Sequence, residues 1–276
     1  MQQPFHTIFI TNAPADARRV AQASVDRVMV DLEYLGKDAR QGHLDTVISR
    51  HAPQDIVAVA EALSDRAATV LVRVDPVHPG SDRQIDDVIA RGADRLMLPM
   101  FQTAEEVARA LAIVRGRVPA TLLVETPAAL VRLPQILALD GDYDLHIGLN
   151  DLHLAMGLDF MFEIVAGRLL DDVAQQCRDA GRAFAIGGVA PVDAQVALSG
   201  EMVLGEYARL GAAGTILGRP FRAPLQDGAD AFCAAVTAVR RGFARMQARD
   251  ADGIAHDQAR FRDVVARIAA AKAGRD

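Results

Sequence analysis

The sequence predicts an α/β chain that folds as a (β/α)8 TIM barrel with extra helices at its C-terminal end. Eight short apolar runs recur along the 276 residues, and a helical pattern follows each of them. Most of these runs are continuously apolar rather than alternating, which is typical of parallel strands covered on both faces. Alternation of strand and helix over about 250 residues is the pattern of such a barrel.

The expected strands follow one another without a linker-like stretch, so we expect a single domain over residues 1–276. The alternative is an open doubly wound sheet, but no G-x-G-x-x-G follows the first strand. The eight expected strands are Thr7–Ile10, Arg27–Glu33, Thr69–Val74, Asp94–Pro99, Thr121–Glu125, Asp144–Gly148, Ala183–Gly187 and Gly214–Gly218.

Hydroxyl residues mark several of the expected helix starts. Ser81 and Thr103 are each followed three residues later by Gln or Glu, as in a capping box. Thr126 and Pro127 place a cap and a first-turn proline between an expected strand and its helix. After the eighth strand, residues 226–276 form an expected extension of two amphipathic helices. We expect its extra apolar face to be buried against a neighbouring subunit.

Composition excludes several classes of function. Lys plus Arg minus Asp plus Glu gives 30 − 36 = −6, and no dense basic patch is present, so no nucleic-acid partner is expected. No stretch approaches the roughly 18–20 apolar residues of a membrane span, so we expect no membrane contact and a cytoplasmic location. The two cysteines, Cys177 and Cys233, lie in helix-like apolar patterns, and we expect both to be buried thiols.

Charged residues gather where the expected strands end. Active sites of (β/α)8 barrels lie at the C-terminal ends of the strands. Because unpaired charges in one small area are costly, a cation and an anionic ligand are the expected partners. The strand-end residues are Asp31, Glu33, Arg73, Pro99, Glu125, Asp151, Gly187, Gly188, Gly218 and Arg219.

Glu125 and Asp151 are the candidate metal ligands. Two carboxylates with open coordination positions suit Mg²⁺ or Mn²⁺, which keep waters and accept substrate oxygens. The alternative is that Glu125 caps a helix and Asp151 pairs with an arginine.

Asp31, Glu33 and Arg73 are candidates for catalysis. The acidic pair is suited to holding a water or orienting a base, or alternatively to an ion pair with Arg73 or Lys37. The guanidinium of Arg73 is expected to grip a carboxylate, either of the substrate or of one of these acids.

Arg219 and four histidines complete the set of candidates. Arg219 follows the eighth strand, where barrels often bind phosphate, although it is alternatively a surface residue. His43, His51 and His153 lie in strand-end loops, where each is either an acid–base group or structural. His146 lies within the sixth strand and is expected in the core or behind the site.

Five stretches identify a family: VMVDLE, VLVRVDP, RGADRLMLPMFQTAEEV, LLVETPAAL and IGLNDLHLAMG. The chain resembles the HpcH/HpaI aldolase and citrate lyase β-subunit family, within the phosphoenolpyruvate-binding barrel superfamily. The resemblance covers nearly the whole chain as far as Arg219. The resemblance implies that Glu125 and Asp151 bind Mg²⁺ or Mn²⁺ and that Arg73 meets the carboxylate of a pyruvate-like acid. It also implies that the pocket for the oxo acid is lined by Gly148, Leu149 and Asn150.

The implied activity is that of a divalent-metal-dependent carbon–carbon lyase or aldolase that works through a metal-stabilised enolate of a 2-oxo acid. A CoA-thioester lyase of the citrate lyase type and a non-catalytic ligand-binding barrel are the alternatives. The resemblance further implies a C-terminal helix swapped between subunits, and we expect a homo-oligomer, a trimer or hexamer.

Three residues depart from the family pattern. Tyr34 stands where the family's pyruvate aldolases have a histidine, Leu123 where they usually have glutamine, and His153 where a serine is common. The base is therefore open between His43, His51, His153 and a metal-bound hydroxide.

Overall fold

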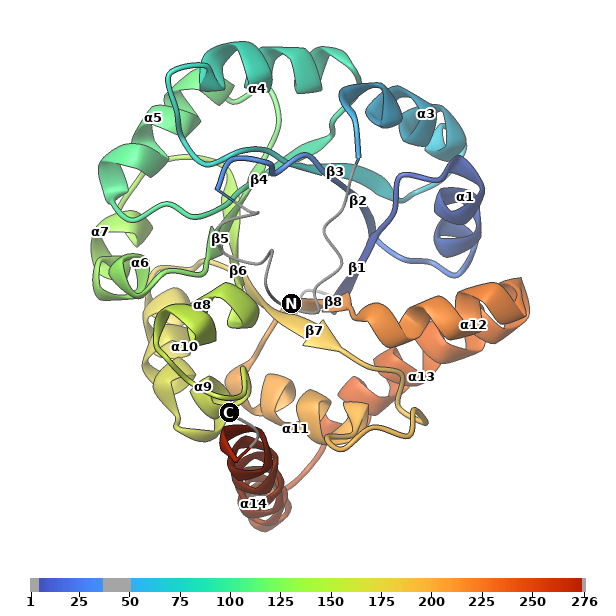
Figure 1. Cartoon of the computed structure of the whole chain (residues 1–276), viewed down its shortest axis with the longest axis vertical. Coiled ribbons are helices and arrows are strands. Elements are labelled where there is room, and N and C mark those ends of the chain that lie inside the picture. Colours follow the sequence, from blue (N-terminus) through green and yellow to red (C-terminus); the bar gives the residue numbers. More distant parts are fainter. Residues whose placement is uncertain (1–4, 37–50, 275–276) are drawn as a thin grey trace.

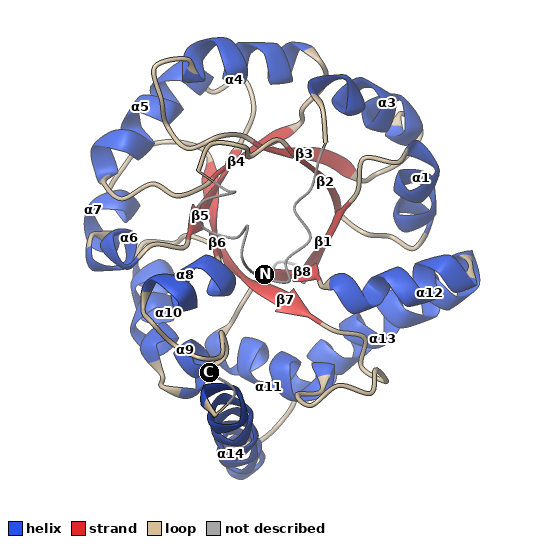
Figure 2. Cartoon of the chain, viewed as in Figure 1, coloured by secondary structure: helices blue, strands red, loops and turns tan. Residues whose placement is uncertain are grey.

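The computed structural model describes residues 5–36 and 51–274, and its strands form a closed parallel barrel in chain order (Figure 1). Each strand pairs with the next one along the chain, and the eighth pairs with the first. Figure 2 shows the strands as a ring with the helices outside it. The predicted (β/α)8 fold is confirmed. The strands are β1 His6–Ile10, β2 Arg27–Asp31, β3 Thr69–Arg73, β4 Arg95–Leu98, β5 Ala120–Val124, β6 Tyr143–Ile147, β7 Phe184–Val189 and β8 Gly214–Leu217.

Helices follow the strands and cover the outside of the barrel. Apolar side chains fill the layer between the strands and these helices. The helices are α1 Pro14–Gln22, α3 Pro53–Leu63, α4 Ser81–Ala90, α5 Ala104–Val114, α6 Pro127–Val131, α7 Leu133–Leu137, α8 Leu149–Ala155, α9 Glu163–Ala166, α10 Leu169–Asp179, α11 Gly200–Leu210, η1 Arg219–Phe221, α12 Arg222–Asp227, α13 Ala229–Gln247 and α14 Ala251–Ala273.

Two of the three predicted helix caps are confirmed. The Thr103 hydroxyl accepts the Glu106 N–H at 3.3 Å, and Thr126 accepts the Ala129 N–H at 3.1 Å. The prediction for Ser81 is wrong, because Gly80 is the N-cap of α4 and Ser81 already belongs to the helix.

The interior of the barrel is divided into layers by the alternation of side chains along each strand. An apolar layer fills its middle, made by Ile8, Met29, Leu71, Met97 and Leu123. Inward-facing residues near the strand starts form a polar layer: Asp144 accepts from Arg27 at 2.7 Å and from Thr121 at 2.5 Å, and lies 3.3 Å from Arg95. The opposite end, where the strands finish, carries the predicted site residues.

The pairing of β7 with β8 is interrupted by a bulge. Ile186 pairs with Thr215, whereas Val189 pairs with Leu217, so β7 holds one more residue than its partner between these two pairs. The extra length falls at Gly187 and Gly188, and Gly188 has the left-handed φ of +54° that favours glycine. From α11, the buried Tyr207 hydroxyl donates to the carbonyls of both glycines, so the bulge is held from behind.

The C-terminal extension packs on its own barrel. α14 contacts α9 and α11 and projects from the rim of the barrel (Figure 1). Phe261, Val265 and Ala269 of α14 are buried, and the Phe261 ring meets Phe162 edge-on at 6.2 Å between centroids. Much of the apolar face of this helix is therefore covered within one chain, and the neighbouring subunit stays a prediction.

The two cysteines differ from each other. Cys177 on α10 is buried, as predicted, but the prediction is wrong for Cys233, which is exposed on α13. The apolar side of α13 that faces the barrel is built from other residues, including Phe232 and Val236.

None of the helices in the described part of the chain is both long enough and apolar enough to span a membrane.

A buried histidine should make the stability of the barrel sensitive to acid. Burial, first of all, lowers the pKa of His146 from 6.5 to about 3. Below pH 6.5 the unfolded chain takes up this proton and the folded chain does not, so folding stability falls with pH down to the folded pKa. The unfolding free energy of wild type, relative to His146→Phe, should fall by about 1.4 kcal/mol per pH unit between pH 6 and 4. Urea unfolding across this range measures the difference.

His256, exposed on α14, provides the control. His256→Gln should keep the wild-type pH dependence. A difference between wild type and His146→Phe that does not vary with pH would contradict a neutral, buried His146.

Candidate active site

An ion pair between the ends of two neighbouring strands forms the centre of the site. Asp31 ends β2, Arg73 ends β3, and the two residues are register partners. Arg73 donates from Nε to Oδ1 of Asp31 at 2.9 Å and from Nη2 to Oδ2 at 2.8 Å. Its Nη1 lies 3.3 Å from Oε2 of Glu33. A guanidinium has five N–H donors, so the group has two more beyond these three contacts.

The acids keep the charge of Arg73 in place. Burial lowers the pKa of Arg73, but Asp31, by its charge and its hydrogen bonds, raises it, and Glu33 and Glu125 add to this, so the net shift is upward. Asp31 and Glu33 are only 1% and 2% exposed. Their predicted alternative, an ion pair with Arg73, is thus present, and their catalytic role stays a prediction.

Glu125 follows directly after β5 and is 3% exposed. Its Oε1 accepts the Met100 N–H at 3.1 Å, and Met100 has a left-handed φ of +56°. Gly148 allows the carboxylate to lie here. A Cβ at position 148 would come within 2.7 Å of the Glu125 Cβ and 2.9 Å of its Oε2.

The Glu125 carboxyl holds its proton more strongly than an ordinary glutamate. Burial is the largest cause, and the charges of Asp151 and Glu33 act in the same direction, whereas Arg73 and the Met100 N–H oppose them; together they raise the pKa of Glu125 to about 8. At neutral pH this group therefore attracts either a proton or another cation.

Asp151 lies in the first turn of α8, three residues past Gly148, rather than at the end of β6 itself. The Gly148 N–H donates to the Val124 carbonyl at 2.9 Å, which joins the end of β6 to the end of β5. Gly148 is the N-cap of α8, and Leu149 and Asn150 begin that helix. The predicted metal ligands and the predicted lining of the oxo-acid pocket are thus parts of one short segment and its neighbour.

The histidines at this end differ in which ring nitrogen is occupied. The Asp31 N–H donates to Nδ1 of His51 at 3.0 Å, so in the neutral ring the proton sits on Nε2. In His153, Nδ1 faces the carbonyl oxygens of Leu149 at 3.2 Å and Asn150 at 2.5 Å, so Nδ1 carries the proton and Nε2 has the lone pair. His43 lies outside the described residues.

Tyr34 stands next to Glu33 and is 46% exposed. Burial, followed by the charges of Asp31, Asp55 and Asp75, raises the pKa of its phenol, which is therefore neutral at pH 7.

Asp75 is a site residue that sequence reasoning missed. One of its oxygens accepts the backbone N–H groups of Tyr34 at 2.7 Å and Leu35 at 2.8 Å, and the other accepts the Gln84 side chain at 2.9 Å. Asp75 thereby fixes the backbone that directly follows Glu33. Its place in VLVRVDP was visible, but nothing in that pattern showed which backbone it would bind. Met100 was missed too, because no sequence signal marks its left-handed backbone.

Arg219 is exposed at the start of η1, directly after β8, and so lies at the same end of the barrel as the other candidates. Gly187 and Gly188 form the bulge described above. The structure thus brings Asp31, Glu33, Arg73 and Glu125 together, with Asp151 close enough for its charge to act on Glu125.

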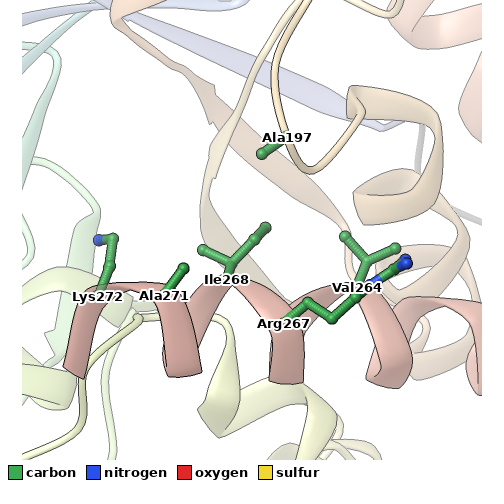
Figure 3. A pocket seen from close by; sticks show the side chains of 6 residues that line it. All are labelled: Ala197, Val264, Arg267, Ile268, Ala271 and Lys272. Atoms are coloured by element: carbon green, nitrogen blue, oxygen red, sulfur yellow. The ribbon is translucent and has the colours of Figure 1, made fainter. Parts of the chain in front are cut away.

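A hollow of about 390 Å³ lies elsewhere, on the outside of the barrel. Figure 3 shows Val264 and Ile268 of α14 pointing toward the segment that carries Ala197. None of the predicted site residues in the described part of the chain lines this hollow, so it is not the candidate active site.

Comparison with known proteins gives one family. The family model described as HpcH/HpaI aldolase/citrate lyase matches residues 8–197. This stretch contains β2 to β7, all of β1 except its first two residues, and every predicted site residue except Arg219. The comparison with curated proteins found no match.

Solved structures share the fold at low sequence identity. An HpcH/HpaI aldolase from Desulfitobacterium hafniense DCB-2 is 16% identical, with a TM-score of 0.62, and the match covers 90% of this chain and 95% of that one. A family protein from Burkholderia cenocepacia J2315 is 17% identical, with a TM-score of 0.61 and coverage of 82% and 95%. Protein CitE from Mycobacterium tuberculosis, in complex with magnesium and acetate, is 19% identical, with a TM-score of 0.57 and coverage of 92% and 95%. At these identities the likenesses support the fold alone.

Removing one partner of the central ion pair should be costly to stability. Asp31→Asn leaves the Arg73 guanidinium without its bidentate carboxylate, and it should lower the unfolding free energy by about 3 kcal/mol in urea titrations at pH 7. The matched control is Glu201→Gln, which removes an exposed ion pair to Arg245 of 2.6 Å and should change stability little. Equal effects of the two substitutions would show that the Asp31–Arg73 pair is not central.

Proposed function

We propose that this chain, which belongs to the HpcH/HpaI aldolase/citrate lyase family, is a divalent-metal-dependent carbon–carbon lyase or aldolase that cleaves or forms a pyruvate-like 2-oxo acid. Family membership supports an enzyme of the lyase or aldolase kind. The observation that carries the finer proposal is the buried Glu125 carboxylate beside Asp151 and Arg73.

The residues present fit a hard divalent cation, Mg²⁺ or Mn²⁺, held by Glu125 and Asp151. Burial and like charges make an ionised Glu125 costly at neutral pH, and a cation removes that cost. The candidate donors are carboxylate oxygens, which suit Mg²⁺ and Mn²⁺ rather than Zn²⁺. Within residues 5–36 and 51–274, no group of three or more His, Cys, Asp or Glu side chains is placed to hold a metal. Two carboxylates with water and substrate oxygens are a usual arrangement for Mg²⁺, which does not require such a cage.

Such a cation would supply Lewis-acid stabilisation of the negative charge that develops on the C2 oxygen when the bond between C3 and C4 breaks. The chain's own residues bind and orient the substrate. Asp31 fixes the plane of the Arg73 guanidinium, so that its further N–H donors are directed at a substrate carboxylate before the substrate binds. The backbone at Gly148 to Asn150 lines the same pocket in our proposal, and Asp31 and Glu33 assist through water.

Proton transfer falls to His153 rather than His51 among the two described histidines at this end. The Nδ1 lone pair of His51 is taken up by the Asp31 N–H, whereas Nε2 of His153 can accept a proton while Nδ1 stays bonded to its helix. Tyr34, neutral at pH 7, serves as a hydrogen-bond donor. His43, in the undescribed segment, is the other candidate base.

One structural neighbour supports the ligand class. The M. tuberculosis CitE structure is described with magnesium and acetate, a divalent cation together with a small carboxylate. We propose the same pair of chemical groups for this chain. We also propose that the chain forms a homo-oligomer, a trimer or hexamer.

The CoA-thioester reaction and the non-catalytic barrel have no specific observation in their favour.

The proposal predicts product release that depends on Glu125. With Mg²⁺ or Mn²⁺, purified protein should release pyruvate, oxaloacetate or an acetyl product from at least one member of a panel of hydroxy-oxo acids. Glu125→Gln keeps the shape of the side chain but removes its charge, and it should lower kcat/KM at least about 100-fold. Loss of a residue that only orients a metal ligand lowers activity by about 10–100-fold, and loss of the ligand itself should lower it more. A coupled assay for each product measures the effect.

Glu105→Gln is the control, since Glu105 is an exposed carboxylate on α5. It should retain wild-type activity. Absence of every product with both metals, or full activity in Glu125→Gln, would overturn the proposed function.

A further inference from the structure

His146 is a buried histidine that the proposed function does not use. It is 1% exposed on β6, and its register partner on β5 is the apolar Leu123. It shares the inward-facing side of β6 with Asp144 below it and Gly148 above it. Neither Nδ1 nor Nε2 of His146 has a hydrogen-bond partner among the residues that the structure describes.

An imidazole in this position is costly to the protein unless something binds it. A buried polar group without a partner loses its hydrogen bonds to water and gains none in return. Burial, first of all, lowers the pKa of His146 to about 3. The charges of His6, Arg27 and Arg73 add to this effect, and the charge of Asp144 opposes it. The ring is therefore neutral at pH 7, with one nitrogen as donor and the other as acceptor.

A glycine of β7 lies beside His146. A Cβ at Gly187 would lie 3.7 Å from Nε2 of His146, so this nitrogen faces the bulge of β7. Gly187 and Gly148 are both partly exposed, whereas His146 is not. Tyr207 donates to the carbonyls of both Gly187 and Gly188, and neither glycine carries a side chain. Nε2 thus lies next to a glycine of the β7 bulge that is itself partly exposed.

We propose that His146 is the polar floor of the substrate pocket and that its Nε2–H donates to a carboxylate oxygen of the bound 2-oxo acid. This inference rests on the proposed function and names a residue that determines its substrate class. A neutral donor selects a ligand with an oxygen acceptor at its buried end. It does so without placing a second positive charge beside Arg73.

The test compares stability with ligand binding in three proteins: wild type, His146→Phe and His146→Asn. The probe is oxalate, a two-carbon dicarboxylate that mimics the paired oxygens of a 2-oxo acid, titrated calorimetrically in saturating Mg²⁺. His146→Phe should melt a few degrees higher than wild type without ligand, because it removes the unpaired polar ring, and should bind oxalate at least tenfold more weakly. His146→Asn keeps a donor and should recover part of that affinity. Mg²⁺ alone should bind all three proteins equally.

Each outcome assigns the ring to one role. Equal oxalate affinity in wild type and His146→Phe, or in wild type and a less stable Phe variant studied below its melting point, overturns the proposal and leaves His146 with an internal water only. If the Phe variant does not fold, His146→Asn and His146→Leu decide the question. Tighter oxalate binding by the Asn variant than by the Leu variant supports the donor role, and equal binding by the two overturns it. Wild-type protein that binds neither Mg²⁺ nor oxalate overturns the proposed function itself.

Discussion

The ionisation of Glu125 is the constraint on which the rest of the site depends. This carboxyl is buried beside Asp151 and Glu33, and its pKa of about 8 reflects the cost of placing one more negative charge there. Arg73 offsets part of that cost, but its strongest contacts are with Asp31. In the proposed function a cation removes this cost, and the anionic end of a small acid binds both the cation and the remaining guanidinium donors.

The barrel provides this environment through its layers. The middle layer of Ile8, Met29, Leu71, Met97 and Leu123 separates the charges at the strand ends from the Arg27–Asp144 pair at the strand starts. Glycine at position 148 leaves room for the Glu125 carboxylate, and neither Gly187 nor Gly188 in the bulge of β7 carries a side chain. His146 lies at the level of the apolar middle layer, where Leu123 is its register partner, and its Nε2 lies next to Gly187.

The sequence predicted the parts of the structure that depend on local pattern. Continuous apolar runs located all eight strands. Strand ends located Asp31, Glu125 and Arg73, because side chains at the ends of parallel strands must share one end of a barrel, whereas Asp151 lies in the first turn of α8. Features that depend on tertiary contacts were not predicted from the sequence. Ser81 has the sequence of a cap, but Gln84 binds Asp75 and Gly80 takes the cap position. Met100 and Asp75 act through backbone groups, which no residue pattern displays, and the exposed Cys233 shows that an apolar neighbourhood in sequence does not decide which face a helix buries.

The central claim is that Glu125 and Asp151 share a divalent cation. Crystals of the protein grown with Mn²⁺ and oxalate, measured at the manganese absorption edge, test it most directly. The account predicts one strong anomalous peak bonded to carboxylate oxygens of both Glu125 and Asp151, with oxalate completing its coordination within reach of Arg73. An anomalous peak elsewhere, or none at saturating Mn²⁺, would contradict it.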